Sequence, residues 1–276
     1  MNNGKIVFIG GGNMARSLIG GLVADGLPAD NIHVVDKQPA VLNTMHQHYA
    51  VQVHEDLAAA VHSASVIVLA VKPQQMQEIV KTLSASWPEN ALLISVAAGI
   101  RLDDIGRWLQ QPAAIVRAMP NTPALVQAGA TALFANDKVS EAQREQAEGI
   151  LRAVGLTIWL DSEHKMDAVT ALSGSGPAYF FLVMEAMENA AIELGLPQET
   201  ARLLCLETAF GAAKMALESG VPATKLRQQV TSPGGTTERA IHELEDGGLH
   251  GLFENALVAA ALRARELGDE LGQDHD

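Results

Sequence analysis

Two glycine-rich stretches of this chain combine the residue types that bind anions through backbone N–H groups. In the first, IGGGNMA at 9–15, Gly10, Gly12 and Ala15 follow the G-x-G-x-x-A spacing, between a strand-like and a helical run. Such glycines form a tight turn and let the backbone approach a pyrophosphate, whose charge meets the free N–H groups of a helix N-terminus. In this context the pattern predicts a dinucleotide-binding turn. The alternative is a tight strand–helix turn without a ligand.

The second stretch, SPGGTT at 232–237, runs into ERAIHELE, which has helical spacing. A proline turn at a helix start would account for Pro233 and the glycines. It does not account for the hydroxyls of Ser232, Thr236 and Thr237 beside free N–H groups. We therefore predict a second anion site more than two hundred residues after the first.

The residues after the second and later strand-like runs leave the choice of nucleotide open. Asp36 would accept hydrogen bonds from a ribose 2′-OH, which favours NAD, whereas Lys37 could offset the 2′-phosphate of NADP. Both could also be solvated surface charges. The segments at 69–74 and 95–100 follow later strands, at the carboxyl edge where open α/β sheets bind ligands. Lys72 in the first of these is either a cofactor contact or a solvated lysine.

A general acid or base for alcohol chemistry is missing from the glycine-rich segment ALSGSGPAYFF at 171–181, which we read as loop-like up to residue 176. The segment has no Lys, His, Asp or Glu. β-Hydroxyacid dehydrogenases carry a Lys and then an Asn after a similar segment, and Phe180 and Met184 stand at those places here. A C=N bond would accept a hydride with less help, because positioning and electrostatics can carry most of the catalysis. No metal site is predicted, since His46 and His48 point to different helix faces.

Composition excludes several classes of protein. The chain of 276 residues has a formal net charge of −13 and no Lys/Arg run, which argues against nucleic-acid binding. Cys205 is the only cysteine, so no internal disulfide can form, and its helical context predicts a buried structural role. Neither a secretory signal nor a bilayer-spanning segment is evident. We expect a soluble, cytoplasmic protein that does not bind membranes.

These sites require an α/β fold with a helical second part. Strand-like runs at 5–10, 32–36, 51–54, 65–71, 91–97 and 113–118 alternate with polar or helical segments, which predicts a Rossmann-type parallel sheet, with further strands at 129–135 and 156–161 around a helix near 140–153. After residue 163 we expect only helices, near 177–194, 198–218, 222–230, 235–246 and 249–268. The predicted domains are 1–162, for the dinucleotide, and 163–276, whose small residues suit either the core or a subunit interface.

Six motifs, IGGGNMA, AVKPQ, SVAAGI, RAMPNTPALVQAGAT, DAVTALSGSGPAYFF and SPGGTTERAIHELE, occur in this order and spacing. Together they resemble the pyrroline-5-carboxylate reductase family over about residues 5–268. The resemblance implies a helical domain that interlocks with a second subunit, dimers that often assemble into decamers, and an active site between one subunit's cofactor and helices at the dimer interface.

The resemblance also assigns site residues. It implies that the SPGGTT loop binds the substrate carboxylate, and that Thr237 is the catalytic residue, hydrogen-bonded to the imine nitrogen. The predicted substrate-binding residues are Ser232, Gly234, Gly235, Thr236 and Thr237. The predicted cofactor-binding residues are Ile9, Gly10, Gly11, Gly12, Asn13, Met14, Asp36, Lys37, Ala70, Val71, Lys72, Pro73, Ala97 and Ala98. The chain departs from the family in two places. Many members have Ser or Arg where this chain has Asp36, Lys37 and Gln38, and the position near the end of the third strand that is often Asn falls at Glu55 or Asp56.

The sequence thus predicts reduction of Δ1-pyrroline-5-carboxylate to L-proline, the last step of proline biosynthesis, with NADPH, or alternatively NADH, as the hydride donor. The alternatives are a reductase of another cyclic imino acid, a relative of the β-hydroxyacid dehydrogenases, and a non-catalytic nucleotide sensor whose helical half only oligomerises.

Overall fold

A computed structural model describes residues 4–273, which form two compact units. The first unit contains residues up to Ser175 together with those from Ala260 on, and the second contains Gly176–Ala259. The sequence places the boundary at 162/163 and the whole C-terminus in the second domain, so the two partitions differ. The reason is that residues 163–175 and the end of the last helix make their contacts within the first unit.

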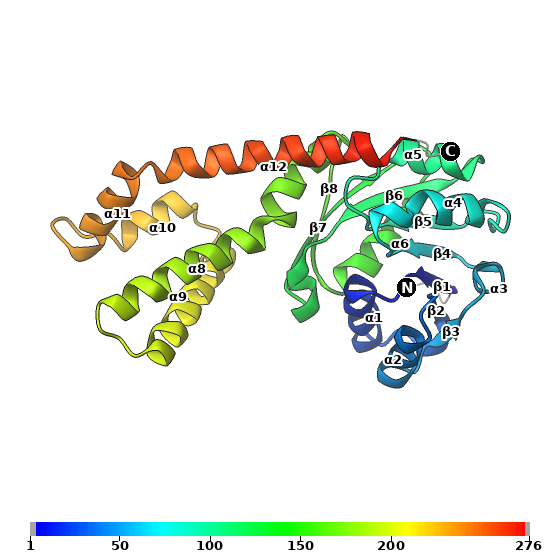
Figure 1. The fold of residues 1–276 in the computed structure, drawn as a ribbon, viewed down its shortest axis with the longest axis horizontal. Coiled ribbons are helices and arrows are strands. Elements are labelled where there is room, and N and C mark those ends of the chain that lie inside the picture. Colours follow the sequence, from blue (N-terminus) through cyan, green and yellow to red (C-terminus); the bar gives the residue numbers. More distant parts are fainter. Residues whose placement is uncertain (1–3, 274–276) are drawn as a thin grey trace. The chain divides into compact units, whose positions relative to one another are not determined.

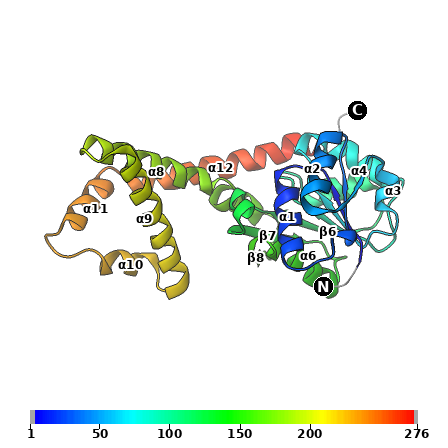
Figure 2. The same ribbon diagram turned by 90° about the horizontal axis from the view of Figure 1, so that it is seen from below.

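The first unit is built on one eight-stranded sheet with the order β3-β2-β1-β4-β5-β6-β7-β8 (Figures 1 and 2). Strands β1 to β6 are mutually parallel, β7 runs antiparallel to β6, and β8 is parallel to β7. Their bounds are Ile6–Ile9, Ile32–Val35, Gln52–His54, Val66–Leu69, Leu92–Ser95, Ala114–Met119, Gly129–Ala135 and Gly155–Trp159. This is the Rossmann-type sheet that the sequence predicts, and each strand lies within one or two residues of its predicted range.

Helices cover both faces of this sheet, because its central strands are apolar on both sides. One core contains residues of α1 (Asn13–Ala24), α2 (Pro39–Tyr49) and α6 (Glu141–Arg152). The other contains residues of α3 (Leu57–Val61), α4 (Met76–Ser84) and α5 (Leu102–Leu109). Side chains of β1 alternate between the two, with Phe8 in the first core and Val7 in the second. The carboxyl ends of β1, β2, β4 and β5 therefore open at one edge, between the helix layers. Short helices η1 (Ala29–Asn31), η2 (Pro73–Gln75) and η3 (Thr122–Val126) complete the connections.

The first unit ends in a charged network that holds the last helix. Arg117 on β6 is 5% exposed, and its Nη1 lies 2.8 Å from Oε1 of Glu163, which also accepts the N–H of Leu102. Arg101 at the start of α5 pairs with Asp269 of α12 (Leu249–Leu271) at 2.7 Å. A buried charge is stable only when it is paired and hydrogen-bonded. The network explains why residues after Ala260 belong to the sheet unit.

The second unit consists of helices, at the places where the sequence predicts them. They are α8 (Gly176–Glu193), α9 (Gln198–Ser219), α10 (Ala223–Gln229), α11 (Thr236–Asp246) and the first part of α12. Among the described residues 176–259, only Gly176, Ala201 and Cys205 are buried. The predicted burial of Cys205 is confirmed, with 6% of its surface exposed. No helix among residues 4–273 is both long and apolar enough to cross a bilayer.

Two histidines meet at the edge of the sheet where β2 pairs with β3. Nδ1 of His33 lies 2.8 Å from Nε2 of His54, and the two rings are stacked. Burial, then the charges of Lys5 and His54, lowers the pKa of His33 from 6.5 to about 4. The unfolded chain therefore binds a proton here at a pH where the folded chain does not, and folding stability must fall as the pH drops through this interval.

We expect the free energy of unfolding, measured by urea titration, to decrease from pH 6.5 to pH 4. In His33→Gln, the share of this decrease that comes from protonation of His33 should disappear. The matched control is His48→Gln, since His48 is exposed on α2 and bonds only the Thr44 carbonyl of its own helix among the hydrogen bonds described. Equal slopes in the two variants would contradict the assignment.

Candidate nucleotide and substrate sites

The turn after β1 brings three strands together through backbone hydrogen bonds. The N–H of Gly10 donates to the Val35 carbonyl of β2, and the N–H of Ala70 donates to the Ile9 carbonyl, each at 2.8 Å. Gly10 has a φ of +97°, and a Cβ there would lie 2.6 Å from the Ala70 carbonyl oxygen. Only glycine fits this position, because a side chain would meet both backbone strain and backbone atoms.

The next residues leave an open N-terminus at α1. No side chain caps this helix at Gly12, so the first N–H groups of Asn13 and Met14 have no partner within the helix. A Cβ on Gly12 would meet nothing within 4 Å, and Gly12 has a φ of −70°. The helix dipole and its free donors favour a negative charge at this end. The turn thus has both the donors and the space that a pyrophosphate needs.

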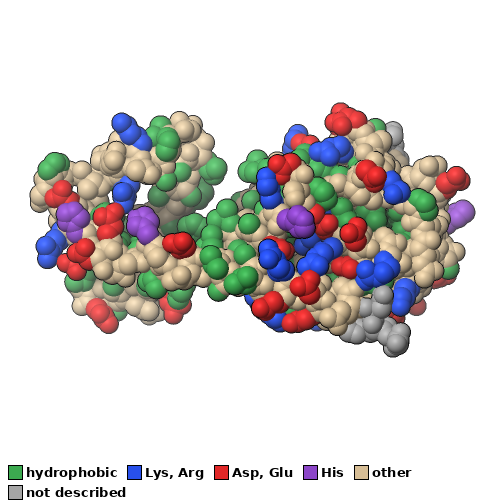
Figure 3. All heavy atoms as spheres, turned by 90° about the horizontal axis from the view of Figure 1, so that it is seen from above, with side chains coloured by type: hydrophobic (Ala, Val, Ile, Leu, Met, Phe, Trp, Pro, Cys, Tyr) green, Lys and Arg blue, Asp and Glu red, His purple; other side chains and the backbone are tan. Residues whose placement is uncertain are grey.

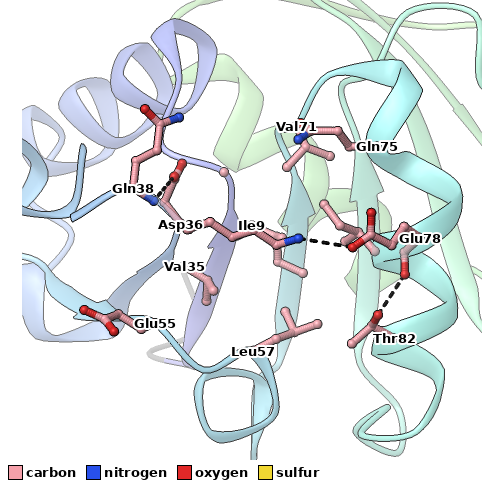
Figure 4. Close-up of a pocket in the computed structure, with 13 residues that line it drawn as sticks. Ile9, Val35, Asp36, Gln38, Glu55, Leu57, Val71, Gln75, Glu78 and Thr82 are labelled. Atoms are coloured by element: carbon pink, nitrogen blue, oxygen red, sulfur yellow. Dashed lines mark hydrogen bonds and ion pairs between the residues drawn. The ribbon is translucent and has the colours of Figure 1, made fainter. Parts of the chain in front are cut away.

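A cavity of about 310 Å³ adjoins this turn, at the carboxyl ends of β1 and β2 (Figure 4). Five of the predicted cofactor residues line it, and they are Ile9, Gly10, Asp36, Lys37 and Val71. The remaining described lining residues are Val35, Gln38, Glu55, Leu57, Gln75, Glu78, Ile79 and Thr82. Aliphatic side chains on opposite sides and polar groups between them suit a flat, polar-edged ligand such as the adenosine end of a dinucleotide.

Asp36 is held by two backbone N–H groups, so it is part of the turn. Its Oδ2 accepts the N–H of Gly11 and its Oδ1 accepts that of Gln38, each at 2.9 Å. Lys37, by contrast, points to α4, where its Nζ lies 3.1 Å from Oε1 of Glu78. Both partners of this ion pair are largely exposed, with side-chain exposures of 80% and 72%. Such pairs contribute about 0–1 kcal/mol to stability.

The structure separates the roles of Glu55 and Asp56, which the sequence leaves open. Glu55 lines the cavity. Asp56 caps α3 instead, because its Oδ1 accepts the N–H of Ala58 at 2.9 Å. Asp56 is therefore accounted for by local structure alone.

Apart from Val71, the predicted cofactor residues that follow β4 and β5 do not line the cavity. Lys72 is exposed at the start of η2, beside Pro73. Ala97 is only 4% exposed and packs in the core, so its side chain cannot reach a ligand, whereas Ala98 is exposed. Contact of the nucleotide with Ala70, Lys72, Pro73, Ala97 and Ala98 stays a prediction.

In the second unit, the SPGGTT loop forms the open N-terminus of α11. Gly234 has a φ of +73°, and the N–H of Gly235 donates to the Ser232 carbonyl at 3.0 Å. No side chain caps the helix at Gly235, so the N–H groups of Thr236 and Thr237 have no helical acceptor. Oε2 of Glu238 accepts the N–H of Gly234 at 2.7 Å. The loop has the free donors that an anion site requires.

The segment predicted as loop-like at 171–176 is instead helical. It contains one turn of π-helix, η4 (Thr170–Gly174), which continues α7 (Lys165–Val169) and precedes α8. Nδ2 of Asn121, in the MPNTP motif, donates to the Ser173 carbonyl at 3.1 Å, while its Oδ1 accepts the N–H of Ala130 at 2.9 Å. Asn121 thereby joins the start of β7 to the π-turn. The loop prediction is wrong because it took these glycines as a sign of irregular backbone. Here they allow close packing instead, since a Cβ on Gly174 would lie 2.5 Å from Cε of Met119.

Sequence reasoning missed the wall of the cavity that η2 and α4 provide. Gln75, Glu78, Ile79 and Thr82 are spaced three, four and seven residues apart, which places them on one helical face. That spacing was readable in the sequence, but nothing local indicates that this face lies against the turn after β1. Among the described residues, no three His, Cys, Asp or Glu side chains gather as a metal site. The absence of a metal stays a prediction.

Comparisons with known proteins show which family the chain resembles. A family model described as pyrroline-5-carboxylate reductase dimerisation matches residues 163–267, and one described as NADP oxidoreductase, coenzyme F420-dependent, matches residues 5–99. The chain is 50% identical to a pyrroline-5-carboxylate reductase of Pseudomonas aeruginosa, over 99% of this chain and all of that protein. It is 42% identical to the enzyme of that name from Haemophilus influenzae, over 97% and 98% of the two chains.

Solved structures give the same result for the fold. A pyrroline-5-carboxylate reductase from Coxiella burnetii has a TM-score of 0.93 and 49% identity, covering 96% of this chain and 99% of that one. A pyrroline carboxylate reductase from Plasmodium falciparum, solved with NADP bound, has a TM-score of 0.86 and 27% identity, covering 97% and 99%.

The structure provides a sharper test of the first anion site than a substitution at Gly10, which would strain the backbone. Because the Cβ position of Gly12 is open, Gly12→Ala should leave the melting temperature within about 2 °C, the size of shift that follows from well under 1 kcal/mol. It should weaken nucleotide binding about tenfold or more, measured by calorimetry, because the methyl group occupies space predicted for the pyrophosphate.

Gly10→Ala should instead lower the melting temperature, since its Cβ meets the Ala70 carbonyl. If Gly12→Ala bound the nucleotide as tightly as the unmodified chain, the pyrophosphate would have to lie elsewhere.

Proposed function

The chain belongs to the pyrroline-5-carboxylate reductase family, and from that membership we propose that it reduces Δ1-pyrroline-5-carboxylate to L-proline, the last step of proline biosynthesis. The enzyme is an NAD(P)H-dependent oxidoreductase acting on a C=N bond, with NADPH as reductant and NADH as the alternative. When bound, the nucleotide would supply a hydride to the ring carbon of the C=N bond, and the ring nitrogen, which takes a proton from solvent, becomes the amine.

One observation carries this proposal more than any other. The 50% identity to a curated reductase extends over 273 residues, which include both glycine-rich loops and the segments between them. A shared nucleotide-binding fold alone would support only a broad class of enzymes, because folds host many functions.

The first unit would bind the nucleotide with its backbone. The turn at Gly10–Met14 would hold the pyrophosphate through N–H donors, and the aliphatic walls of the adjoining cavity would hold the adenine ring. The segments Ala70–Pro73 and Ala97–Ala98 would lie along the nicotinamide half. Of Ala97, only the backbone can serve in this way, because the side chain is buried.

The second unit would bind the imino acid. The open N-terminus of α11 presents N–H groups that would hold the substrate carboxylate, with Ser232, Gly234, Gly235 and Thr236 forming the loop. Thr237 is half-buried in the first turn, and its hydroxyl would hydrogen-bond the imine nitrogen. A hydroxyl both donates and accepts, so the same group can orient the ring nitrogen before and after reduction.

The residues favour an imine over an alcohol as substrate. A protonated imine already carries the positive charge that draws the hydride, so the enzyme needs orientation and a water-poor site more than a strong acid. Phe180 and Met184 stand on α8 where β-hydroxyacid dehydrogenases have a Lys and an Asn, and a phenyl or thioether group cannot transfer a proton. Another cyclic imino acid remains the alternative substrate.

In a single copy of the chain, the helices of the second unit leave much of their apolar surface uncovered. Hydrophobic side chains are visible on the surface of this unit (Figure 3). The large apolar side chains that its helices expose include Phe180 at 68%, Phe210 at 64% and Leu252 at 64%. Such patches on a folded chain mark surfaces that another chain covers. With the family model for dimerisation at 163–267, this supports a homo-oligomer whose helical domain, 163–276, interlocks with that of a second copy. We further propose that five dimers form a decamer, located in the cytoplasm.

The activity is tested by following oxidation of NADPH or NADH at 340 nm in the presence of pyrroline-5-carboxylate. We expect turnover with at least one nucleotide and formation of L-proline. In Thr237→Ala, kcat should fall about tenfold or more while the dissociation constant of the nucleotide changes less than about twofold, because the hydroxyl is assigned to the imine alone.

Thr237→Ser should restore most of the lost rate, and Thr224→Ala, an exposed threonine on α10, should change neither quantity. Nucleotide binding without any turnover would favour the sensor hypothesis. Equal losses in binding and rate would contradict the role of Thr237.

The assembly is tested by sedimentation velocity at micromolar concentration. We expect a dimer or larger species and no monomer, and Phe210→Asp should shift the distribution to smaller species, because it places a charge in an apolar interface. Lys214→Asp, on the same helix, changes an already charged and exposed position and should leave the distribution unchanged. A monomeric unmodified chain would contradict this assembly.

A further inference from the structure

Charge is distributed unevenly in the cavity beside the first glycine turn. Three carboxylates line it, those of Asp36, Glu55 and Glu78. Of the described lining residues, only Lys37 carries a positive charge. Lys37 follows β2 and Glu78 lies on α4, and the ion pair between them is drawn as a dashed line to Glu78 in Figure 4.

The two nicotinamide nucleotides differ in a group that is sensitive to this charge. NADPH carries a phosphate on the 2′ position of its adenosine ribose, where NADH has a hydroxyl. A phosphate monoester has a charge of about −1.5 to −2 at pH 7. Three carboxylates repel such a group, whereas a carboxylate accepts a hydrogen bond from a hydroxyl. The ammonium group of Lys37 is the lining group that would attract the phosphate.

Glu78 reduces the attraction that Lys37 can exert. The Nζ of Lys37 lies 3.1 Å from Oε1 of Glu78, so a phosphate must compete with that carboxylate for the ammonium group. Glu78 also adds its own repulsion. Asp36 differs, because both of its oxygens accept backbone N–H groups, of Gly11 and Gln38, and the residue is part of the turn. Glu78 is exposed on α4 and can be changed without breaking the turn.

We propose that Glu78 is a specificity-determining residue that lowers the preference for NADPH over NADH, by holding Lys37 and by repelling the 2′-phosphate. The inference rests on the proposed function only in taking the cavity as the adenosine end of the nucleotide site. Glu78 acts through Lys37 and through its charge, and it takes no part in the chemistry of the imine.

The test measures binding and does not depend on turnover. Dissociation constants of NADP⁺ and NAD⁺ are determined by calorimetry for the unmodified chain and for Glu78→Gln, at low and high salt. We expect Glu78→Gln to bind NADP⁺ about three- to tenfold more tightly and NAD⁺ within about twofold of the unmodified chain. The gain should shrink at about 0.5 M salt, since exposed charges are screened.

Two further variants separate the causes. Lys37→Met should weaken NADP⁺ binding and leave NAD⁺ nearly unchanged, and the double variant Lys37→Met/Glu78→Gln should lose most of the gain of Glu78→Gln. The matched control is Glu145→Gln, which removes the same charge from an exposed residue of α6, outside this cavity, and should leave the NADP⁺ to NAD⁺ ratio unchanged.

The outcomes distinguish this inference from the proposed function. If both nucleotides bind and Glu78→Gln changes them equally, or not at all, the role of Glu78 is overturned while the reductase assignment stands. If neither nucleotide binds to the unmodified chain, both are overturned. A selective gain for NADP⁺ that depends on Lys37 supports the inference, and the ratio of kcat/KM values for NADPH and NADH should then rise by the same factor.

Discussion

The close approach of the Gly10 backbone to the end of β4 is the constraint on which the nucleotide site depends. Hydrogen bonds from Gly10 to β2 and from the Ala70 N–H to the Ile9 carbonyl of β1 bring three strand ends together, and no Cβ fits between them. This contact sets where α1 begins and therefore where its free N–H groups point. It also brings Asp36 within hydrogen-bond distance of Gly11. The absence of a side chain at Gly10 thus allows the contact that positions the turn, the helix and the rim of the cavity.

Large apolar side chains are buried in the sheet unit and exposed in the helical unit. In the sheet unit, the central strands are covered on both faces, and the cores on either side contain large fully buried side chains such as Phe8 and Trp108. In the helical unit, almost every large apolar side chain is exposed. Apolar burial stabilises by roughly 25 cal/mol per Å², so helices that leave this surface in water lack most of their stabilisation until another chain covers it. In the proposed assembly, a second copy of the chain supplies this cover.

Under the proposed function, a chain with a net charge of −13 binds two anionic ligands, and the structure offers backbone groups for both. Both sites are helix N-termini without a side-chain cap, at Gly12 and Gly235, where the peptide dipoles supply partial positive charge at short range. Distant carboxylates are screened by salt over about 8–10 Å and matter less. Carboxylates at the rim of the cavity are close enough to matter, and this is why the balance between Lys37 and Glu78 bears on the choice of nucleotide.

Local patterns in the sequence determined the elements and the two glycine-rich turns at the starts of α1 and α11. Apolar runs and helical spacing are set by neighbouring residues, so the strands and helices lie within a few residues of their predicted bounds, and the fold class is confirmed. The tertiary structure alone decided that β7 runs antiparallel, that residues 163–175 and the end of α12 join the sheet unit, and that the segment at 171–176 is a π-turn tied to Asn121. It also decided that Ala97 is buried, that Asp56 caps a helix, and that Glu78 faces Lys37. Each of these depends on which distant segments come into contact, and such contacts leave no periodic signal within a short stretch of chain.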